Sequence, residues 1–142
     1  MDFGHWVHKT NTGTNPGTKN SGILKTLLDT ELDNGITDAS LASNQVTLPA
    51  GTYFFYGFAT GWVVGLKRCL LYDTTGATYI GIGVNSYQDD GAEIRGRFTL
   101  SVASVLELRF STSVTDAAVG WGNASSNGND EHFSRFIVWK ES

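Results

Sequence analysis

The chain has 142 residues and a formal net charge of −4 at pH 7, and its longest basic run is Lys67-Arg68. A phosphate backbone would repel such a chain overall, and no apolar stretch approaches the length of a membrane span. We therefore expect neither nucleic-acid binding nor membrane insertion. Seventeen glycines and only two prolines, with abundant Thr, Ser and Asn, predict one all-β domain of short strands and turns.

The N-terminal part lacks the basic and apolar segments of a signal peptide, which predicts synthesis in the cytoplasm without export by that route. Residues 9–22 are polar and rich in Gly, Asn and Thr, as in a loop or linker. We therefore expect an N-terminal segment or linker over residues 1–22 and the folded domain over residues 23–142. His5 and His8 would point to opposite sides of a strand, which gives no metal site, although on a helix they could converge.

The first part of the domain contains two candidate strands. Residues 23–32 are interpreted as extended, with a short helix as the alternative, because the leucines of this segment also fit helical spacing. A short strand is expected over residues 45–48, and Pro49-Ala50-Gly51 ends it.

Residues 52–60 form the most informative candidate strand, because aromatic side chains occupy both of its faces. They alternate along the strand, with Phe54, Tyr56 and Phe58 on one face and Tyr53 and Phe55 on the other. A half-exposed strand alternates apolar with polar residues, so both faces here are expected to meet protein. One face fits the interior of a sandwich. The other predicts contact with a second copy of the chain, with a long loop of the same chain as the alternative.

The remaining candidate strands are joined by turns and polar loops. They are expected over residues 62–72, 78–84, 95–101, 105–111 and 133–140, with a turn at residues 73–76 and loops at residues 85–93 and 113–131. Strands spaced in this way predict an antiparallel sandwich or jelly roll.

Four blocks of sequence, in order along the chain, resemble one known family. The blocks are Leu48-Pro49-Ala50-Gly51-Thr52-Tyr53, Lys67-Arg68-Cys69-Leu70-Leu71-Tyr72-Asp73-Thr74-Thr75, Arg95-Gly96-Arg97-Phe98-Thr99-Leu100 and Arg135-Phe136-Ile137-Val138-Trp139-Lys140. They resemble strands of the trimeric jelly rolls related to the C1q and tumour-necrosis-factor (TNF) domains, in the version found at bacteriophage tail-fibre tips and in prophage proteins. The resemblance runs from about residue 23 to residue 140 and is more specific for the fold than for a ligand.

The resemblance implies a C1q/TNF-like antiparallel jelly roll that forms a homotrimer. In this family the strand after the Pro-Ala-Gly turn lines the trimer axis, which would make Tyr56 and Phe58 interface residues. It also implies a non-catalytic domain that attaches a phage-like particle to a cell-surface receptor or glycan, with the virion as its destination. The alternatives are a purely structural trimerisation or capping domain of a fibre, and a monomeric carbohydrate-binding module.

The polar loops supply the candidate ligand-binding residues. In the last loop, Trp121 lies between two glycines and is followed by Asn123 and Asp130, a composition suited to stacking on a sugar ring and bonding its hydroxyls. The alternative is that the Trp121 ring packs in the core. Tyr87 and Asp89, in the other polar loop, are expected to form the opposite wall of the site.

No group of residues predicts catalysis, and we expect no cofactor. Nothing pairs a nucleophile with a base, and Cys69, the only cysteine, is expected to be a buried free thiol. Asp89, Asp90 and Glu93 lack the spacing of a calcium loop, which favours solvated turn acids over a metal site. His132 is expected in solvent, with a metal at a trimer axis as the alternative.

Overall fold

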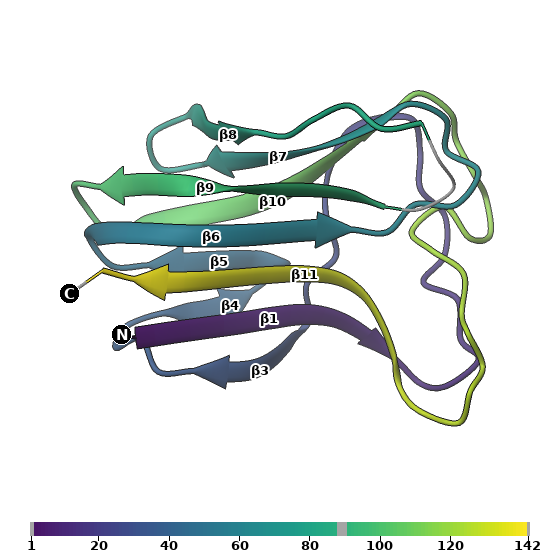
Figure 1. Ribbon diagram of the computed structural model, residues 1–142, viewed down its shortest axis with the longest axis horizontal. Helices are drawn as coiled ribbons and strands as arrows, with labels where there is room; N and C mark the ends of the chain where they lie inside the picture. Colours follow the sequence, from purple (N-terminus) through teal and green to yellow (C-terminus); the bar gives the residue numbers. More distant parts are fainter. Residues whose placement is uncertain (1, 88–90, 142) are drawn as a thin grey trace.

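The computed structural model describes residues 2–87 and 91–141 of the chain. Within these residues the protein has strands and no helix, arranged as two antiparallel sheets that pack face to face (Figure 1). The all-β sandwich predicted from the strand spacing is confirmed. Asp89 and Asp90, considered above as ligand and calcium residues, lie outside the described residues.

The front sheet has the strand order β3-β1-β11-β6-β9. Its strands are β3 (Thr30–Asn34), β1 (Asp2–Thr10), β11 (Glu131–Lys140), β6 (Gly51–Ala59) and β9 (Ala92–Leu100). β6 pairs with β9 along its whole length, and β11 pairs with β6 from Lys140 and Tyr53 to Arg135 and Phe58. Long strands in continuous register place side chains from neighbouring strands directly beside one another.

The back sheet has the strand order β4-β5-β10-β7-β8, and β2 pairs with β10 as well. Its strands are β4 (Ser40–Ala42), β5 (Gln45–Leu48), β10 (Ser104–Thr112), β7 (Lys67–Asp73), β8 (Thr78–Ile82) and β2 (Gly22–Lys25). β2 and β5 share one side of β10, because β2 pairs with its last residues and β5 with its first.

The N-terminal strand β1 lies inside the front sheet, between β3 and β11, although its residues were expected to belong to a linker. Trp6 pairs with Phe136 of β11, its ring is fully buried, and its Nε1 donates to Glu31 Oε2 at 3.0 Å. The folded domain therefore starts well before residue 23. Residues 11–21 are the part of the expected linker that forms a loop.

The expected strand over residues 23–32 is extended, as predicted, but it is divided between the two sheets. β2 pairs with β10 in the back sheet, whereas β3 pairs with β1 in the front sheet. Between them the Thr26 and Leu28 side chains are buried, and Leu28 N donates to Asn44 Oδ1 at 2.9 Å. The helical alternative is wrong, because each half of the segment finds its backbone partners in a different sheet.

Residues 60–66 form a loop, although residues 62–66 were expected to begin the strand that ends at Tyr72. Gly65 has a φ of 73°, which an extended strand does not allow. The regular strand therefore begins at Lys67, where β7 starts.

The core lies between the sheets and receives alternate residues of each strand. Tyr53 and Phe55 of β6 face inward, as their alternation predicts, and the Tyr53 hydroxyl donates to Pro49 O at 2.7 Å. Further aromatic members of the core are Trp6, Phe98, Phe110, Trp121 and Phe136. An aromatic core of this kind stabilises a domain of this size without a disulfide.

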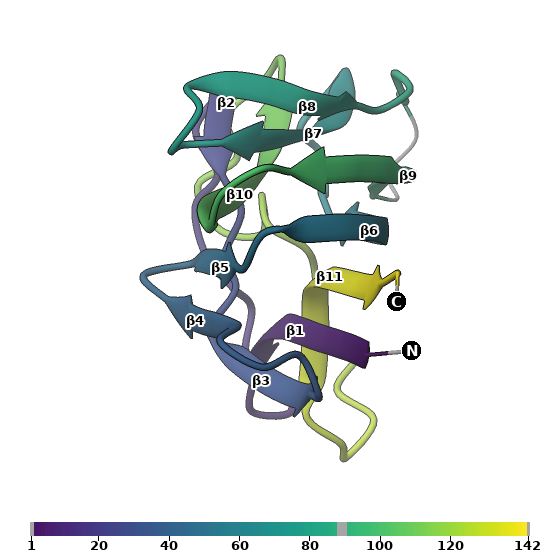
Figure 2. The same cartoon turned by 90° about the vertical axis from the view of Figure 1, so that its left-hand side faces the viewer.

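Both chain ends lie at one end of the sandwich and the long loops lie at the other (Figures 1 and 2). The loops over residues 11–21, 60–66 and 113–130 gather at the end opposite the termini. Among the described residues there is no helix long and apolar enough to cross a bilayer.

Candidate functional site

The outer face of the front sheet carries a continuous group of large, mostly aromatic side chains. The outside of an antiparallel sheet is usually polar, and β9 follows this rule with Glu93, Arg95, Arg97 and Thr99. β1, β6 and β11 instead present Phe3, His5, Phe54, Tyr56, Phe58, Ile137 and Trp139. We call these seven residues the aromatic face.

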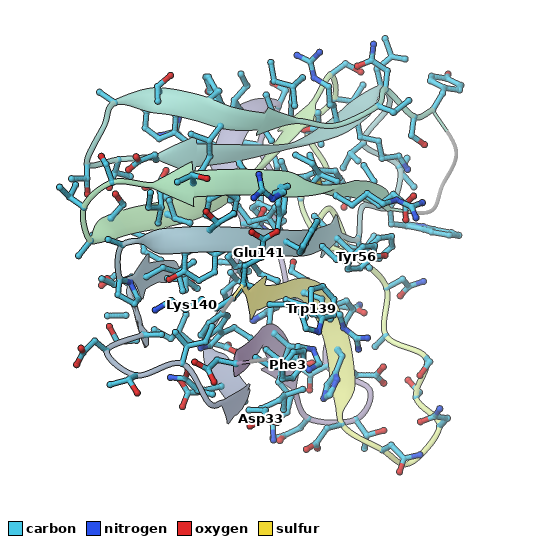
Figure 3. The ribbon with its side chains drawn as sticks, turned by 60° about the vertical axis from the view of Figure 1, so that its left-hand side comes forward. Phe3, Asp33, Tyr56, Trp139, Lys140 and Glu141 are labelled. Atoms are coloured by element: carbon cyan, nitrogen blue, oxygen red, sulfur yellow. The ribbon has the colours of Figure 1, made fainter. Side chains whose placement is uncertain are left out.

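The register of the front sheet places these side chains beside one another. Trp139 pairs with Phe3 of β1 on one side and with Phe54 of β6 on the other. The ring centroids of Phe3 and Trp139 are 5.7 Å apart. Two residues along β11, Ile137 pairs with Tyr56. Figure 3 shows Phe3, Trp139 and Tyr56 on this one face of the sheet.

The aromatic face is shielded only by its own side chains, and Figure 3 shows no covering segment from the described residues. Phe54 is 44% exposed and the other six residues are half-buried. Contiguous apolar surface of this kind, with charged residues at its margin, is typical of an interaction surface. The expectation that Phe54, Tyr56 and Phe58 share one face of β6 is confirmed by the alternating burial of the strand.

Charged pairs form the margin of the aromatic face along β9. The Arg97 guanidinium lies 5.9 Å from the centroid of the Phe54 ring and donates to both oxygens of Glu141 at 2.8 Å. These hydrogen bonds lower the pKa of the Glu141 carboxyl. Arg95 pairs with Glu93 at 2.7 Å. The margin is therefore polar and ordered, as in the rim of a protein interface.

Burial and neighbouring cations act together on His5. Burial lowers the pKa of the His5 imidazole, the charges of Arg135 and His132 lower it further, and Asp33 acts in the opposite direction. Its Nε2 is buried and has no hydrogen-bond partner among the described residues. His5 is therefore held in its neutral form, which suits an apolar contact surface.

Trp121, predicted as a sugar-stacking ring, is buried. Its side chain is 6% exposed, its ring lies 6.1 Å from that of Phe110, and the Lys19 ammonium lies 5.3 Å from its centroid. This is the core placement considered as the alternative above. The prediction of a surface stacking ring is wrong for this residue, because loop composition alone does not reveal the Phe110 and Lys19 side chains around the ring.

The other predicted ligand residues lie at the loop end of the domain, except for one that falls outside the described residues. Tyr87 is 71% exposed, Asn123 is exposed, and Asp130 is exposed and pairs with Lys9 at 3.1 Å. Asp89 lies outside the described residues. A ligand-binding role for these loop residues stays a prediction.

Two charged residues that the sequence did not single out organise the loop end. Lys19 is fully buried, and its Nζ donates to the carbonyls of Asn20 and Gly22 at 2.6 and 3.1 Å. Burial lowers the pKa of Lys19 to about 8. Glu131 accepts backbone N–H bonds from Gly13, Ser125 and Ser126, which lower its pKa to about 2. Lys19 Nζ also donates to Thr112 Oγ1 at 3.1 Å, 93 positions away, and Glu131 lies 118 positions from Gly13, which sequence patterns cannot reveal.

Comparison with solved structures finds the same fold in animal proteins. Murine APRIL matches with a TM-score of 0.63 and 11% identity, over 97% of this chain and 98% of that chain. The globular domain of zebrafish complement 1qA matches with a TM-score of 0.58 and 11% identity, over 100% of this chain and 98% of that chain. No family of known sequences and no curated protein matches the chain.

At this level of identity the likeness shows the fold. The chain has the C1q/TNF-like jelly-roll fold, and the two neighbours match it over nearly its full length. The fold implied by the four sequence blocks is therefore confirmed, and it also includes the strand at residues 2–10, which was expected to be part of a linker.

Proposed function

We propose that this chain is a non-catalytic binding domain that assembles as a homotrimer through its aromatic face. In that assembly its loop end attaches a phage-like particle to a cell-surface receptor of glycan class. The observation that carries the proposal is the aromatic face itself, since seven large side chains lie outside the sheet with no described segment over them. A second copy of the chain removes this surface from water, which favours association.

Symmetry supports a closed assembly through one such face. Three copies around an axis bury three equal surfaces and leave none open to further growth. Tyr56 and Phe58 belong to the aromatic face, so the interface residues expected from the family resemblance fall on the surface that needs a cover. The polar margin formed by Arg97 and Glu141 would exclude water around the contact.

The placement of the loops supports attachment at the end opposite the chain termini. Both termini lie at the same end of the sandwich, and the loops over residues 60–66 and 113–130 lie at the opposite end. If the chain were joined to a particle through either terminus, these loops would face away from the particle. A trimer presents three copies of this loop end side by side. Three weak sites on one particle gain avidity on a repetitive surface, so no deep pocket is required of each. The phage context rests on the resemblance of the sequence blocks, and the two structural neighbours described above are animal proteins.

A structural trimerisation or capping role is the second candidate, and the burial of Trp121 favours it. The ring expected to stack on sugars is in the core, which leaves Tyr87 as the large exposed aromatic of the predicted ligand residues. A capping domain needs the aromatic face and no receptor site.

The experiment that separates these roles combines solution mass with glycan binding. The intact protein is screened on an array of bacterial surface polysaccharides, and Tyr87→Ala and Asn123→Ala are compared with Ile82→Ala, an exposed residue at the far edge of the back sheet. If the domain attaches to glycans, we expect a trimer that binds at least one glycan of the array. The loop variants should weaken that binding, and Ile82→Ala should leave it unchanged. A trimer that binds no glycan supports capping, and a monomer that binds supports a carbohydrate-binding module.

A further inference from the structure

A pocket opens on the front sheet at the point where β6 and β11 separate. The ladder between these strands ends at Phe58 and Arg135. Just beyond this point, the register between β1 and β11 shifts between Val7 and Lys9. As a result, two residues of β11 lie opposite the single residue His8 of β1. Such a β-bulge bends a strand, and β11 curves away from β6 at this point (Figure 1).

The pocket is small and mixed in character. Its volume is about 230 Å³, and it is lined by Tyr56, Phe58 and Thr60 on one side and by residues 132–135 of β11 on the other. Pockets for drug-sized ligands run from about 300 to 1,000 Å³, so this one suits a ligand of the size of a single sugar ring. Aromatic walls with a few polar groups are typical of such sites.

Two polar groups of the pocket, those of Arg135 and Ser134, have no hydrogen-bond acceptor among the described residues. Arg135 is half-buried, and none of the ion pairs formed by the described residues involves it. Ser134 is 1% exposed, and its Oγ has no hydrogen-bond partner among the described residues. A buried hydroxyl and a half-buried guanidinium without partners are costly to a folded chain unless a ligand or solvent satisfies them.

The local charge favours an anion, although the chain as a whole is negative. His132 lies beside Arg135 on the pocket wall, and both charges act on His5 of the neighbouring strand. Of the carboxylates in the adjoining segments, Glu93 is paired with Arg95 and Asp130 with Lys9. The Arg135 guanidinium is therefore left for a ligand. Arg matches a carboxylate with two parallel N–H bonds.

We propose that this pocket binds an acidic monosaccharide unit, a sugar ring that carries a carboxylate. The Arg135 guanidinium holds the carboxylate and His132 adds a second donor. The ring lies against Phe58 and Tyr56, and its hydroxyls reach Thr60 and Ser134.

The inference deepens the proposed glycan attachment and rests on it for its biological meaning. The pocket sits at the loop end of the aromatic face, so the sides of Tyr56 and Phe58 that line it must stay outside the proposed contact between copies. A trimer would therefore bring three such pockets together near its axis, which suits a polysaccharide with repeated acidic units.

The test titrates the intact protein with D-glucuronate, D-galacturonate and N-acetylneuraminate by calorimetry or by NMR. D-glucose and D-galactose are the neutral controls, and sodium acetate is the carboxylate without a ring. Arg135→Gln is expected to weaken binding of the acidic sugars at least tenfold, and His132→Gln, at an exposed position, to weaken it less. Arg68→Gln is the matched control, since Arg68 is a half-buried arginine on β7 of the back sheet. Circular dichroism and a thermal melt verify the fold of each variant.

Binding of at least one acidic sugar that Arg135→Gln removes and Arg68→Gln keeps supports the pocket. Equal binding of neutral and acidic sugars, or equal binding of acetate alone, would overturn it. So would no binding of any acidic sugar at about 10 mM, which is above the millimolar effective concentrations that linked sites reach. Solution mass, measured on the same samples, keeps the two proposals apart. A trimer that does not bind acidic sugars refutes only the proposed sugar pocket. A monomer that binds them refutes only the proposed homotrimer.

Discussion

Phe54 provides the sharpest test of the proposed assembly. It is the most exposed member of the aromatic face, and its side chain points away from the core of its own chain. Replacing it by Gln removes an aromatic ring from the contact surface and adds an amide that the contact must desolvate. The fold of the single chain should tolerate the change. The substitution removes the contact between the Phe54 ring and the Arg97 guanidinium, 5.9 Å from the ring centroid, and such a contact is worth only about 0.5–1 kcal/mol at an exposed site.

The expected size of the effect follows from the exposed area. An aromatic side chain buries about 150–250 Å² in total, and 44% of Phe54 remains exposed. About 90 Å² is therefore left to bury, worth about 2 kcal/mol per chain at about 25 cal/mol per Å². Three copies lose about 6 kcal/mol in a trimer, which is between four and five orders of magnitude in the equilibrium constant. Because the midpoint concentration of a trimer varies as the square root of that constant, it should rise by about two orders of magnitude.

The assay is sedimentation velocity over a dilution series from nanomolar to high micromolar concentration. Ile82→Gln is the control, because Ile82 is a more exposed apolar residue on the outer edge of the back sheet. An unchanged midpoint for Phe54→Gln, or an equal shift for Ile82→Gln, would refute an assembly through the aromatic face. Urea unfolding of both variants in their monomeric range should give free energies within about 1 kcal/mol of the parent.

Three further predictions concern the charged and titratable groups inside the fold. Burial raises the pKa of the Cys69 thiol to about 12 from an ordinary 9, so the contribution of Cys69 to the free energy of unfolding should fall by about 1.4 kcal/mol per pH unit above pH 9. In urea titrations the difference between the parent and Cys69→Ala should show this slope, and a difference that does not change with pH would contradict it. Because burial lowers the pKa of Lys19 to about 8, the unfolded chain binds more protons between pH 8 and 10.5, and stability should rise over that range in Cys69→Ala. Adding Lys19→Met to Cys69→Ala should abolish the rise and, through lost hydrogen bonds to buried acceptors, cost about 1–3 kcal/mol at pH 7. Glu131 has a pKa of about 2 in the fold, below its ordinary 4.5, so its contribution is present above pH 4.5 and lost as the pH falls toward 2. Glu131→Gln should flatten that part of the melting-temperature profile, and an unchanged acid profile would show that the carboxylate does not anchor the loops.

The sequence predicted those parts of the fold that depend on local alternation. The inward Tyr53 and Phe55 and the outward Phe54 of β6 follow from a period of two along one strand, and the structure confirms each. The bounds of β5 also follow from local signals, because Pro49 ends that strand. Such features need no knowledge of distant segments.

The parts that the sequence missed depend on partners far along the chain. β1 belongs to the front sheet because it pairs with β11, about 130 residues away, whereas its own sequence mixes Gly, His and charged residues. The same pairing creates the aromatic face, since Phe3 and Trp139 meet only through that register. Sequence reasoning therefore found the outward aromatics of β6 but not the surface that they complete.

The loop site was the least predictable part for a related reason. A Trp between glycines has the same sequence whether its ring stacks on a ligand or packs in the core, and the choice for Trp121 is made by Phe110 and the buried Lys19. The pocket beside Arg135 arises from a bulge in β11, and a bulge has no clear signature in a strand that otherwise alternates. The signal in the sequence that could have indicated it is an Arg inside an otherwise apolar strand.

The most direct test of the account is the solution mass of the unmodified protein, measured by sedimentation equilibrium at neutral pH over micromolar concentrations. If the aromatic face packs against two other copies of the chain, the expected mass is three times the 15.4 kDa of one chain. A mass of 15.4 kDa at every concentration would contradict the central claim, because the seven residues of the face would then remain in water in the working form of the protein.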